Sequence, residues 1–303
     1  MSLDSQALIH ADSWLNAPID KADKLAIEAL KTHDPDGFNE SFYKLLEFGT
    51  GGMRGIMRLG SNGINRYTIG QATQGLANAL KGPDKLSVAI ACDCRINSQH
   101  FAETAANVLA ANGIDVYLFD SLRPTPLLSF ALREKGCDAG IVITASHNPK
   151  AYNGYKVYGK DGGQIVPPQD ADILQSVRNV TIGDILWSGG QGRIHRLGEA
   201  MDQVYINMLE SMQLTKARDL SVVFTSLHGT AITLLPEALK CFGFSQVHVL
   251  ASQAEPDGNF PTVQSPNPEE AAALELAINK AHELGADLVI GCDPDADRVG
   301  IAL

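Results

Sequence analysis

Apolar runs and helical patterns alternate through the first half of this chain. Short apolar runs predict buried strands, and apolar residues at helical spacing between them predict covering helices. The predicted elements are a strand at 88–92, a helix at 99–111 with Ser98 as its N-cap, a strand at 115–119, a helix at 126–135 and a strand at 139–144. Strands that alternate with helices are typical of an α/β fold with a largely parallel sheet.

The same alternation begins again in the second half of the chain. The predicted elements are helices at 199–212, 231–241 and 268–284 and strands at 221–225, 247–250 and 287–291. Asn267 as N-cap, Pro268 at the first helical position and Gly285 after the end favour the limits of the last helix. The repeated order predicts a second α/β unit built like the first.

A third pattern precedes both units. Residues 12–48 have apolar positions at helical spacing, which Asp34-Pro35-Asp36-Gly37 interrupts, so we expect an N-terminal arm of two helices. A chain of 303 residues exceeds the usual size of one core. We therefore predict two successive α/β domains with mixed or parallel sheets behind a helical arm. The expected limits are 1–44 for the arm, 45–198 for the first domain and 199–303 for the second.

Composition narrows the choice of partners. The hydrophobic fraction of 45% is enough for two cores, and no apolar stretch is long enough to cross a membrane. A formal net charge of −11 argues against a nucleic-acid partner, because phosphate backbones need clustered Lys and Arg. Any anionic substrate must then be held by local positive groups. Five cysteines without paired Cys-x-x-Cys motifs predict reduced thiols and a cytoplasmic protein.

A hydroxyl group stands at the end of the strand predicted at 139–144. The strand leads into Thr-Ala-Ser-His-Asn-Pro, in which Pro149 prevents regular structure from continuing. Ligands of open α/β sheets bind at the carboxyl ends of strands, so Ser146 is a candidate nucleophile. A serine that only caps a turn is the alternative.

Three carboxylates follow the last predicted strand at alternate positions. Asp293, Asp295 and Asp297 can face one side of an extended loop, and their oxygen ligands suit Mg²⁺. Each pair at contact distance repels by roughly 4 kcal/mol at an effective dielectric near 20, so the loop needs a compensating cation. A solvated acidic turn is one alternative, and a phosphatase-type loop with Asp293 as nucleophile is another. An EF-hand is excluded, because Arg298 stands where its sixth-position glycine is required.

Together with two further segments, these loops resemble a known family. The four segments lie at 49–55 (Gly-Thr-Gly-Gly-Met-Arg-Gly), 144–149, 153–156 (Asn-Gly-Tyr-Lys) and 292–298. In order and spacing they are similar to the α-D-phosphohexomutases, the family of phosphoglucomutase and phosphomannomutase. The resemblance covers roughly residues 45 to 303.

The resemblance implies a chemistry for these residues. It implies that Ser146 is carried as a phosphoserine whose phosphate joins Asp293, Asp295 and Asp297 around Mg²⁺. Lys156 occupies the family's Asn-Gly-x-Lys position, and we expect it to move the proton of the sugar hydroxyl, by a pKa lowered near Mg²⁺ and arginines. His147 is the alternative for that role.

Further residues are expected to bind phosphate. Arg54 and Arg298 can grip it with paired hydrogen bonds. Thr50 in the glycine-rich turn and His228 after the strand at 221–225 are weaker candidates. Asp93 and Arg95 are expected to form a buried structural pair below the site.

The resemblance implies a Mg²⁺-dependent mutase that moves phosphate between C1 and C6 of a hexose through phospho-Ser146 and a bisphosphate intermediate. Its expected activator is glucose 1,6-bisphosphate or a similar sugar bisphosphate. Its expected substrate is a hexose phosphate. A phosphopentomutase is one alternative. A phosphatase-type hydrolase and a sugar-phosphate binding module without catalytic activity are the alternatives from other functional classes. The resemblance also implies domains III and IV, which this sequence does not contain, so we expect an inactive fragment. The sequence leaves the sugar and the oligomeric state open.

Overall fold

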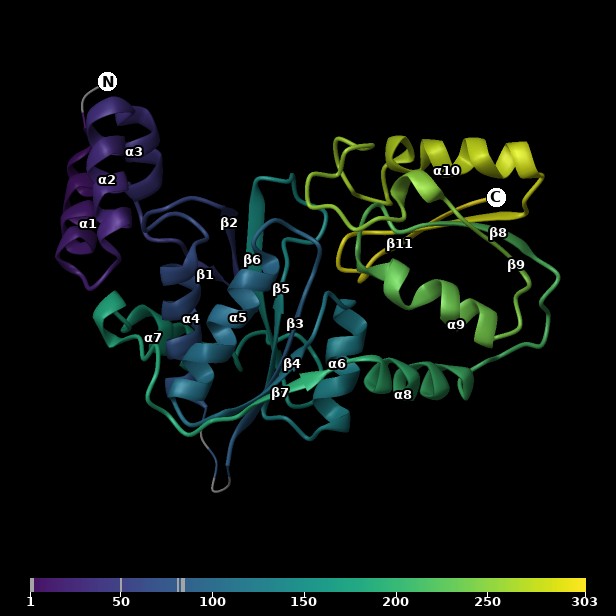
Figure 1. Cartoon of the computed structure of the whole chain (residues 1–303), viewed down its shortest axis with the longest axis horizontal. Helices are drawn as coiled ribbons and strands as arrows, with labels where there is room; N and C mark the ends of the chain where they lie inside the picture. Colours follow the sequence, from purple (N-terminus) through teal and green to yellow (C-terminus); the bar gives the residue numbers. More distant parts are fainter. Residues whose placement is uncertain (1–2, 50, 81, 83–84) are drawn as a thin grey trace.

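Two sheets form the centres of two α/β units in the computed structural model, which describes residues 3–49, 51–80, 82 and 85–303. Figure 1 shows the N-terminal helices at one end of the molecule and the second unit at the other. The prediction of two successive α/β domains with a helical arm is confirmed. The limits at 44 and 198 remain a proposal.

The first sheet is mixed. In spatial order its strands are β1 (Phe48–Gly49), β2 (Gly52–Ile56), β6 (Tyr152–Gly159), β5 (Ala139–Ile143), β3 (Ser87–Cys92), β4 (Asp115–Phe119) and β7 (Ile194–Leu197). β5, β3, β4 and β7 are parallel to one another, whereas β6, β2 and β1 extend the sheet in antiparallel order. Sequence patterns missed these antiparallel strands, and β6 matters most because it carries Lys156.

Helices cover both faces of this sheet. Because side chains alternate along a strand, Val88 and Ile90 of β3 face one core and Ala89 and Ala91 face another. The first core is completed by α4 (Arg66–Ala79), α5 (Ser98–Ala111) and α7 (Ala171–Arg178), and the second by α6 (Thr125–Glu134) and α8 (Glu199–Glu210). Helix α5 begins one residue earlier than predicted: Asn97 is its N-cap, because the Ser98 hydroxyl binds Asp93 instead.

The second sheet has four strands. Its order is β11 (Val299–Ala302), β10 (Leu288–Cys292), β8 (Ser221–Thr225) and β9 (Gln246–Val249), and only β11 is antiparallel. One face packs on α10 (Ala271–Leu284), and the other packs on η2 (Thr230–Thr233) and α9 (Leu235–Cys241). The short helices η1 (Ile182–Asp184) and η3 (Ala251–Gln253) lie in connections.

The predicted start of the last helix is wrong. Helix α10 begins at Ala271, not Pro268, and Glu270 is its N-cap. Asn267 instead forms a turn in which its side chain binds Glu270, and the Pro268 carbonyl lies directly against Gly300 of β11. Its end at Leu284, followed by Gly285 in the left-handed conformation, is confirmed.

The arm contains three helices instead of two: α1 (Ser5–Asn16), α2 (Lys21–His33) and α3 (Pro35–Phe42). Asp34 separates the last two, and its carboxylate caps α3 at the Gly37 N–H. Trp14 packs edge-on against Tyr67 of α4, whose hydroxyl also donates to Asp23 at 2.6 Å. Within the described part of the chain, no helix is both long and apolar enough to span a membrane.

Candidate active site

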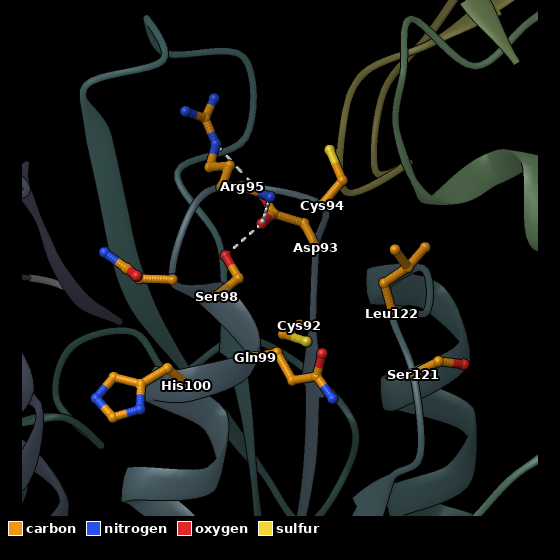
Figure 2. Close-up of a pocket in the computed structure, with 10 residues that line it drawn as sticks. Cys92, Asp93, Cys94, Arg95, Ser98, Gln99, His100, Ser121 and Leu122 are labelled. Atoms are coloured by element: carbon orange, nitrogen blue, oxygen red, sulfur yellow. Dashed lines mark hydrogen bonds and ion pairs between the residues drawn. The ribbon is translucent and has the colours of Figure 1, made fainter. Parts of the chain in front are cut away.

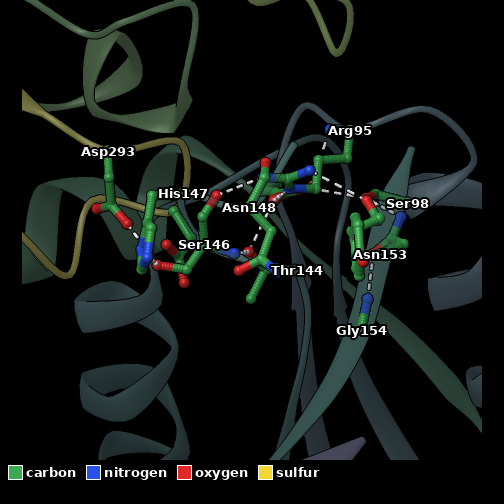
Figure 3. Close-up of polar contacts among 12 residues, drawn as sticks. Arg95, Ser98, Thr144, Ser146, His147, Asn148, Asn153, Gly154 and Asp293 are labelled. Carbon is green, nitrogen blue, oxygen red and sulfur yellow. Dashed lines mark hydrogen bonds and ion pairs between the residues drawn. The ribbon is translucent and has the colours of Figure 1, made fainter. Parts of the chain in front are cut away.

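The loop after β5 holds Ser146 in an unusual backbone conformation. Ser146 has a φ of 52°, in the left-handed region that few residues other than glycine adopt. The Thr144 hydroxyl stabilises this turn, because it accepts a hydrogen bond from the Ser146 N–H at 2.8 Å and donates to Asp93 at 2.7 Å. The serine side chain therefore leaves the end of the strand in a fixed direction (Figure 3).

A buried arginine anchors the same loop from below. The Arg95 guanidinium donates to the backbone carbonyls of Ser146 at 2.6 Å and Asn148 at 2.5 Å. It also donates to the carbonyls of Pro149 and Tyr152, each at 3.0 Å. Its Nε lies 3.3 Å from Asp93, and neither side chain is exposed. The predicted buried pair of Asp93 and Arg95 is confirmed, and it holds the serine loop by backbone contacts.

A pocket of about 310 Å³ lies beside this anchor, between the start of α5 and the loop at Ser121 and Leu122 (Figure 2). Cys94 also lines it, and burial raises the pKa of this thiol well above its usual value. Ser146 and the three aspartates are not among its lining residues. The pocket therefore borders the anchor of the loop and not the serine hydroxyl.

The aspartate loop after β10 meets the serine loop directly. The Ser146 hydroxyl donates to Asp293 Oδ2 at 2.6 Å, although the two residues are 147 positions apart. One carboxylate oxygen from each of Asp293, Asp295 and Asp297 lies within 4.8 Å of the others. The structure thus brings the predicted nucleophile and the predicted metal ligands together.

Backbone amides shape the aspartate loop. Asp293 Oδ1 accepts hydrogen bonds from the N–H groups of Asp297 at 3.1 Å and Arg298 at 3.0 Å. Burial, followed by the neighbouring Asp295 carboxylate, raises the pKa of Asp293 to about 8. Three carboxylates this close are therefore not all ionised unless positive charge joins them.

Lys156 supplies part of that charge. Its ammonium group on β6 donates to Asp295 Oδ2 at 2.7 Å and to Asp297 Oδ2 at 2.8 Å. Burial lowers the pKa of Lys156, but the carboxylates of Asp295 and Asp297 outweigh burial and raise the pKa above its usual value. The expectation of a lowered lysine pKa is therefore wrong for this arrangement, in which Lys156 is a cation.

One carboxylate oxygen in the cluster has no hydrogen-bond donor. Asp295 Oδ2 accepts from Lys156 and from the Thr125 hydroxyl at 3.0 Å, while Asp295 Oδ1 is buried without a partner among the described residues. A buried oxygen of this kind, within a set of three carboxylates, fits a hard divalent cation. Sequence reasoning missed Thr125, since only the three-dimensional fold brings it to Asp295.

His147 lies beside the serine hydroxyl, and two arginines lie near His147. His147 Nδ1 lies 3.2 Å from Ser146 Oγ, and burial, then Arg298 and Arg54, lower the pKa of His147. Arg54 donates to the Asn148 side chain at 2.8 Å. Arg298 forms an ion pair with the exposed Glu269, which lies just before α10. The two arginines provide the local positive charge that an anionic ligand of an acidic protein requires.

Of the other two predicted phosphate-binding residues, one cannot be placed and one lies away from this cluster. Thr50 lies outside the described residues. His228 is buried after β8, where its Nδ1 lies 3.1 Å from the Glu255 carbonyl and its Nε2 lies 2.9 Å from the Thr262 hydroxyl. Both ring nitrogens thus have partners in the second unit, so we leave His228 out of the proposed site.

Comparison with known proteins identifies relatives of both units. The family model for phosphoglucomutase/phosphomannomutase alpha/beta/alpha domain I matches residues 45–182, and that for domain II matches residues 203–303. The chain is 41% identical over 299 residues to a phosphoglucomutase from Staphylococcus haemolyticus (strain JCSC1435), with 95% of this chain and 54% of the relative covered. It is 43% identical over 272 residues to a phosphoglucomutase from Staphylococcus aureus (strain N315), with 87% of this chain and 49% of the relative covered.

A solved structure agrees with these matches. The crystal structure of a phosphoglucomutase/phosphomannomutase family protein from Burkholderia thailandensis has a TM-score of 0.67 and 26% identity to this chain. The match covers 84% of this chain and 54% of that structure. The chain therefore spans about half the length of the relatives that it matches.

Proposed function

The chain belongs to the phosphoglucomutase/phosphomannomutase family, and we propose from this premise that it contains the phosphoryl-transfer centre of a phosphohexose mutase. The observation that carries the proposal is the 2.6 Å hydrogen bond between Ser146 Oγ and Asp293. It places a hydroxyl group on a strand end beside three carboxylates that can hold a cation. Neither a turn-capping serine nor a solvated acidic loop requires this contact.

In the proposed reaction, phospho-Ser146 donates its phosphoryl group to a hydroxyl of a hexose monophosphate. The bond between phosphorus and the serine oxygen breaks, a bond between phosphorus and the sugar oxygen forms, and the proton of the sugar hydroxyl passes through a base to the released serine oxygen. In the second half, the other phosphoryl group of the resulting bisphosphate returns to the Ser146 oxygen, and the serine proton passes back to the sugar oxygen that is released. The sugar phosphate is thereby isomerised and the phosphoserine restored. The proposed activator is glucose 1,6-bisphosphate or a similar sugar bisphosphate, which would phosphorylate Ser146 before the first cycle.

The residues around Ser146 have distinct proposed roles. Asp293, Asp295 and Asp297 would hold Mg²⁺, which would neutralise charge on the phosphoryl group during transfer. Lys156 and His147 are the proposed proton carriers. His147, whose pKa is lowered, can accept the proton of the sugar hydroxyl, whereas Lys156, a cation inside the cluster, can donate a proton to the oxygen that leaves. Arg54 and Arg298 are the proposed phosphate ligands. The relatives from Staphylococcus are phosphoglucomutases, which favours glucose phosphates over other sugars.

The test is to locate the phosphoryl group after incubation with glucose 1,6-bisphosphate. Intact mass and peptide mapping are expected to find one phosphoryl group on Ser146 and none in S146A. The matched control is S226A, because Ser226 is a buried serine in the corresponding loop of the second unit. This variant is expected to carry the label on Ser146 as the unaltered chain does. Label on Asp293 would contradict the proposal and indicate a phosphatase-type reaction.

A further inference from the structure

Thr125 connects the two units at the aspartate loop. It is the first residue of α6, the helix that lies on the side of the first unit toward the second (Figure 1). Its backbone N–H donates to the Asp295 carbonyl at 2.9 Å, and its hydroxyl donates to Asp295 Oδ2 at 3.0 Å. Both residues are buried, so these hydrogen bonds form away from water.

The hydroxyl of Thr125 decides which oxygen of Asp295 stays free. Thr125 and Lys156 both donate to Oδ2, one from a helix and the other from a strand, and together they fix the rotation of the carboxylate. Oδ1 is left buried without a hydrogen-bond partner among the described residues. Leaving such an oxygen unpaired is costly, and a bound cation would satisfy it.

Capping of the helix does not account for this hydroxyl. Pro124 is the N-cap of α6 and makes no side-chain capping bond, and within the described part of the chain the Thr125 hydroxyl binds only Asp295. We propose that Thr125 is a positioning residue for the metal site, which holds Asp295 so that Oδ1 faces the cation. This inference rests on the proposed function, because it presumes that the aspartates bind a metal.

The experiment is a calorimetric titration of the chain with Mn²⁺, a hard cation that also prefers oxygen ligands. T125V removes the hydroxyl but keeps the branched shape and the backbone hydrogen bond, and we expect roughly 10- to 100-fold weaker Mn²⁺ binding, as for other partners that orient metal ligands. T125S restores the hydroxyl and is expected to recover most of the affinity. Thermal melts of both variants report whether the fold is kept.

The matched control is Thr230→Val. Thr230 is also buried against the aspartate loop, and its N–H donates to the Pro294 carbonyl at 2.8 Å, but its hydroxyl has no partner among the described residues. We therefore expect T230V to bind Mn²⁺ as the unaltered chain does.

Three outcomes would overturn the inference, and they are distinguishable. Unchanged binding in T125V, with binding lost in D293N, would remove Thr125 and leave the metal site in place. Equal weakening in T125V and T230V would indicate a general packing effect. An unaltered chain that binds no Mn²⁺ would contradict both this inference and the metal site of the proposed function.

Discussion

The loops that follow β5 and β8 share a backbone design. In each, a threonine hydroxyl accepts a hydrogen bond from the backbone N–H two residues later. The Ser146 N–H donates to the Thr144 hydroxyl at 2.8 Å, and the Leu227 N–H donates to the Thr225 hydroxyl at 3.1 Å. The residue that donates has a positive φ in both loops, 52° for Ser146 and 45° for Leu227. Both turns stand at the carboxyl end of an interior strand.

The two loops differ in the side chain of the residue that has the left-handed backbone conformation. In the first unit Ser146 directs its hydroxyl to Asp293, whereas in the second unit Leu227 is completely buried. The following histidines differ in the same way, because His147 is half-buried beside two arginines and His228 is enclosed. One turn design can thus present a reactive group or complete a core, and the side chain at a single position decides which.

The anchors below the loops also differ. The Thr144 hydroxyl donates to Asp93, which is paired with Arg95, whereas the Thr225 hydroxyl donates to the neutral Gln253 at 2.6 Å. Arg95 adds four bonds to backbone carbonyls of the serine loop and its exit. We infer that the unit which presents the serine holds its loop more rigidly than the unit which buries a leucine.

The largest expected effect comes from the charged anchor. D93N leaves the Arg95 guanidinium buried without its carboxylate, and we expect the free energy of unfolding to fall by about 3–5 kcal/mol. Q253L removes the neutral anchor and is expected to lower the free energy of unfolding by only about 1–3 kcal/mol. The substitution leaves hydroxyl groups without a hydrogen-bond partner, but it leaves no buried charge unpaired. Urea denaturation followed by circular dichroism measures both. An equal or larger loss in Q253L would contradict the difference between the anchors.

A smaller effect is expected at the tip of the second loop. Leu227→Ala removes a fully buried side chain and is expected to lower the free energy of unfolding by about 2–5 kcal/mol, like other buried leucines. The control is Leu214→Ala at a fully exposed leucine, which should change stability by no more than about 0.5 kcal/mol. A loss of less than 1 kcal/mol in L227A, measured in the same urea titration, would show that this tip is not a packing position.

The smallest effect on stability is expected at the tip of the first loop. S146A removes the hydrogen bond to Asp293 and the longer one with His147 but little volume, so we expect a loss of about 0.5–1.5 kcal/mol in the same assay. The proposed acceptance of phosphate should nevertheless be abolished. A loss as large as that of L227A would instead make Ser146 a structural residue and weaken the contrast between the two loops.

Sequence patterns revealed the parts of this molecule that depend on local order. The buried runs before Ser146 and Asp293 are apolar and short, so their strands and the loops after them could be predicted. Helix α4 was missed because Gly, Thr and Gln interrupt its apolar pattern. The start of α10 was misplaced because contacts of residues 265–270 with β11 and with each other, not the local Asn-Pro signal, set the turn there.

The contacts across the site could not be predicted in the same way. Thr125 meets Asp295 across 170 positions, and nothing in its neighbourhood in the sequence marks it as part of a site. The lysine pKa was misjudged for a related reason: the prediction placed Lys156 among cations, whereas the fold places its ammonium group between two carboxylates. Candidate residues were thus visible in the sequence, but their pairings required the fold.

The position of Lys156 within β6 has a consequence for how this segment tolerates change. Lys156 is aligned with Val142 of β5 on one side and Gly52 of β2 on the other. Since neighbouring residues of a strand point to opposite faces, deletion or insertion of one residue before Lys156 would turn its ammonium group away from the aspartates. Length variation in this segment should therefore be selected against even where single substitutions are accepted.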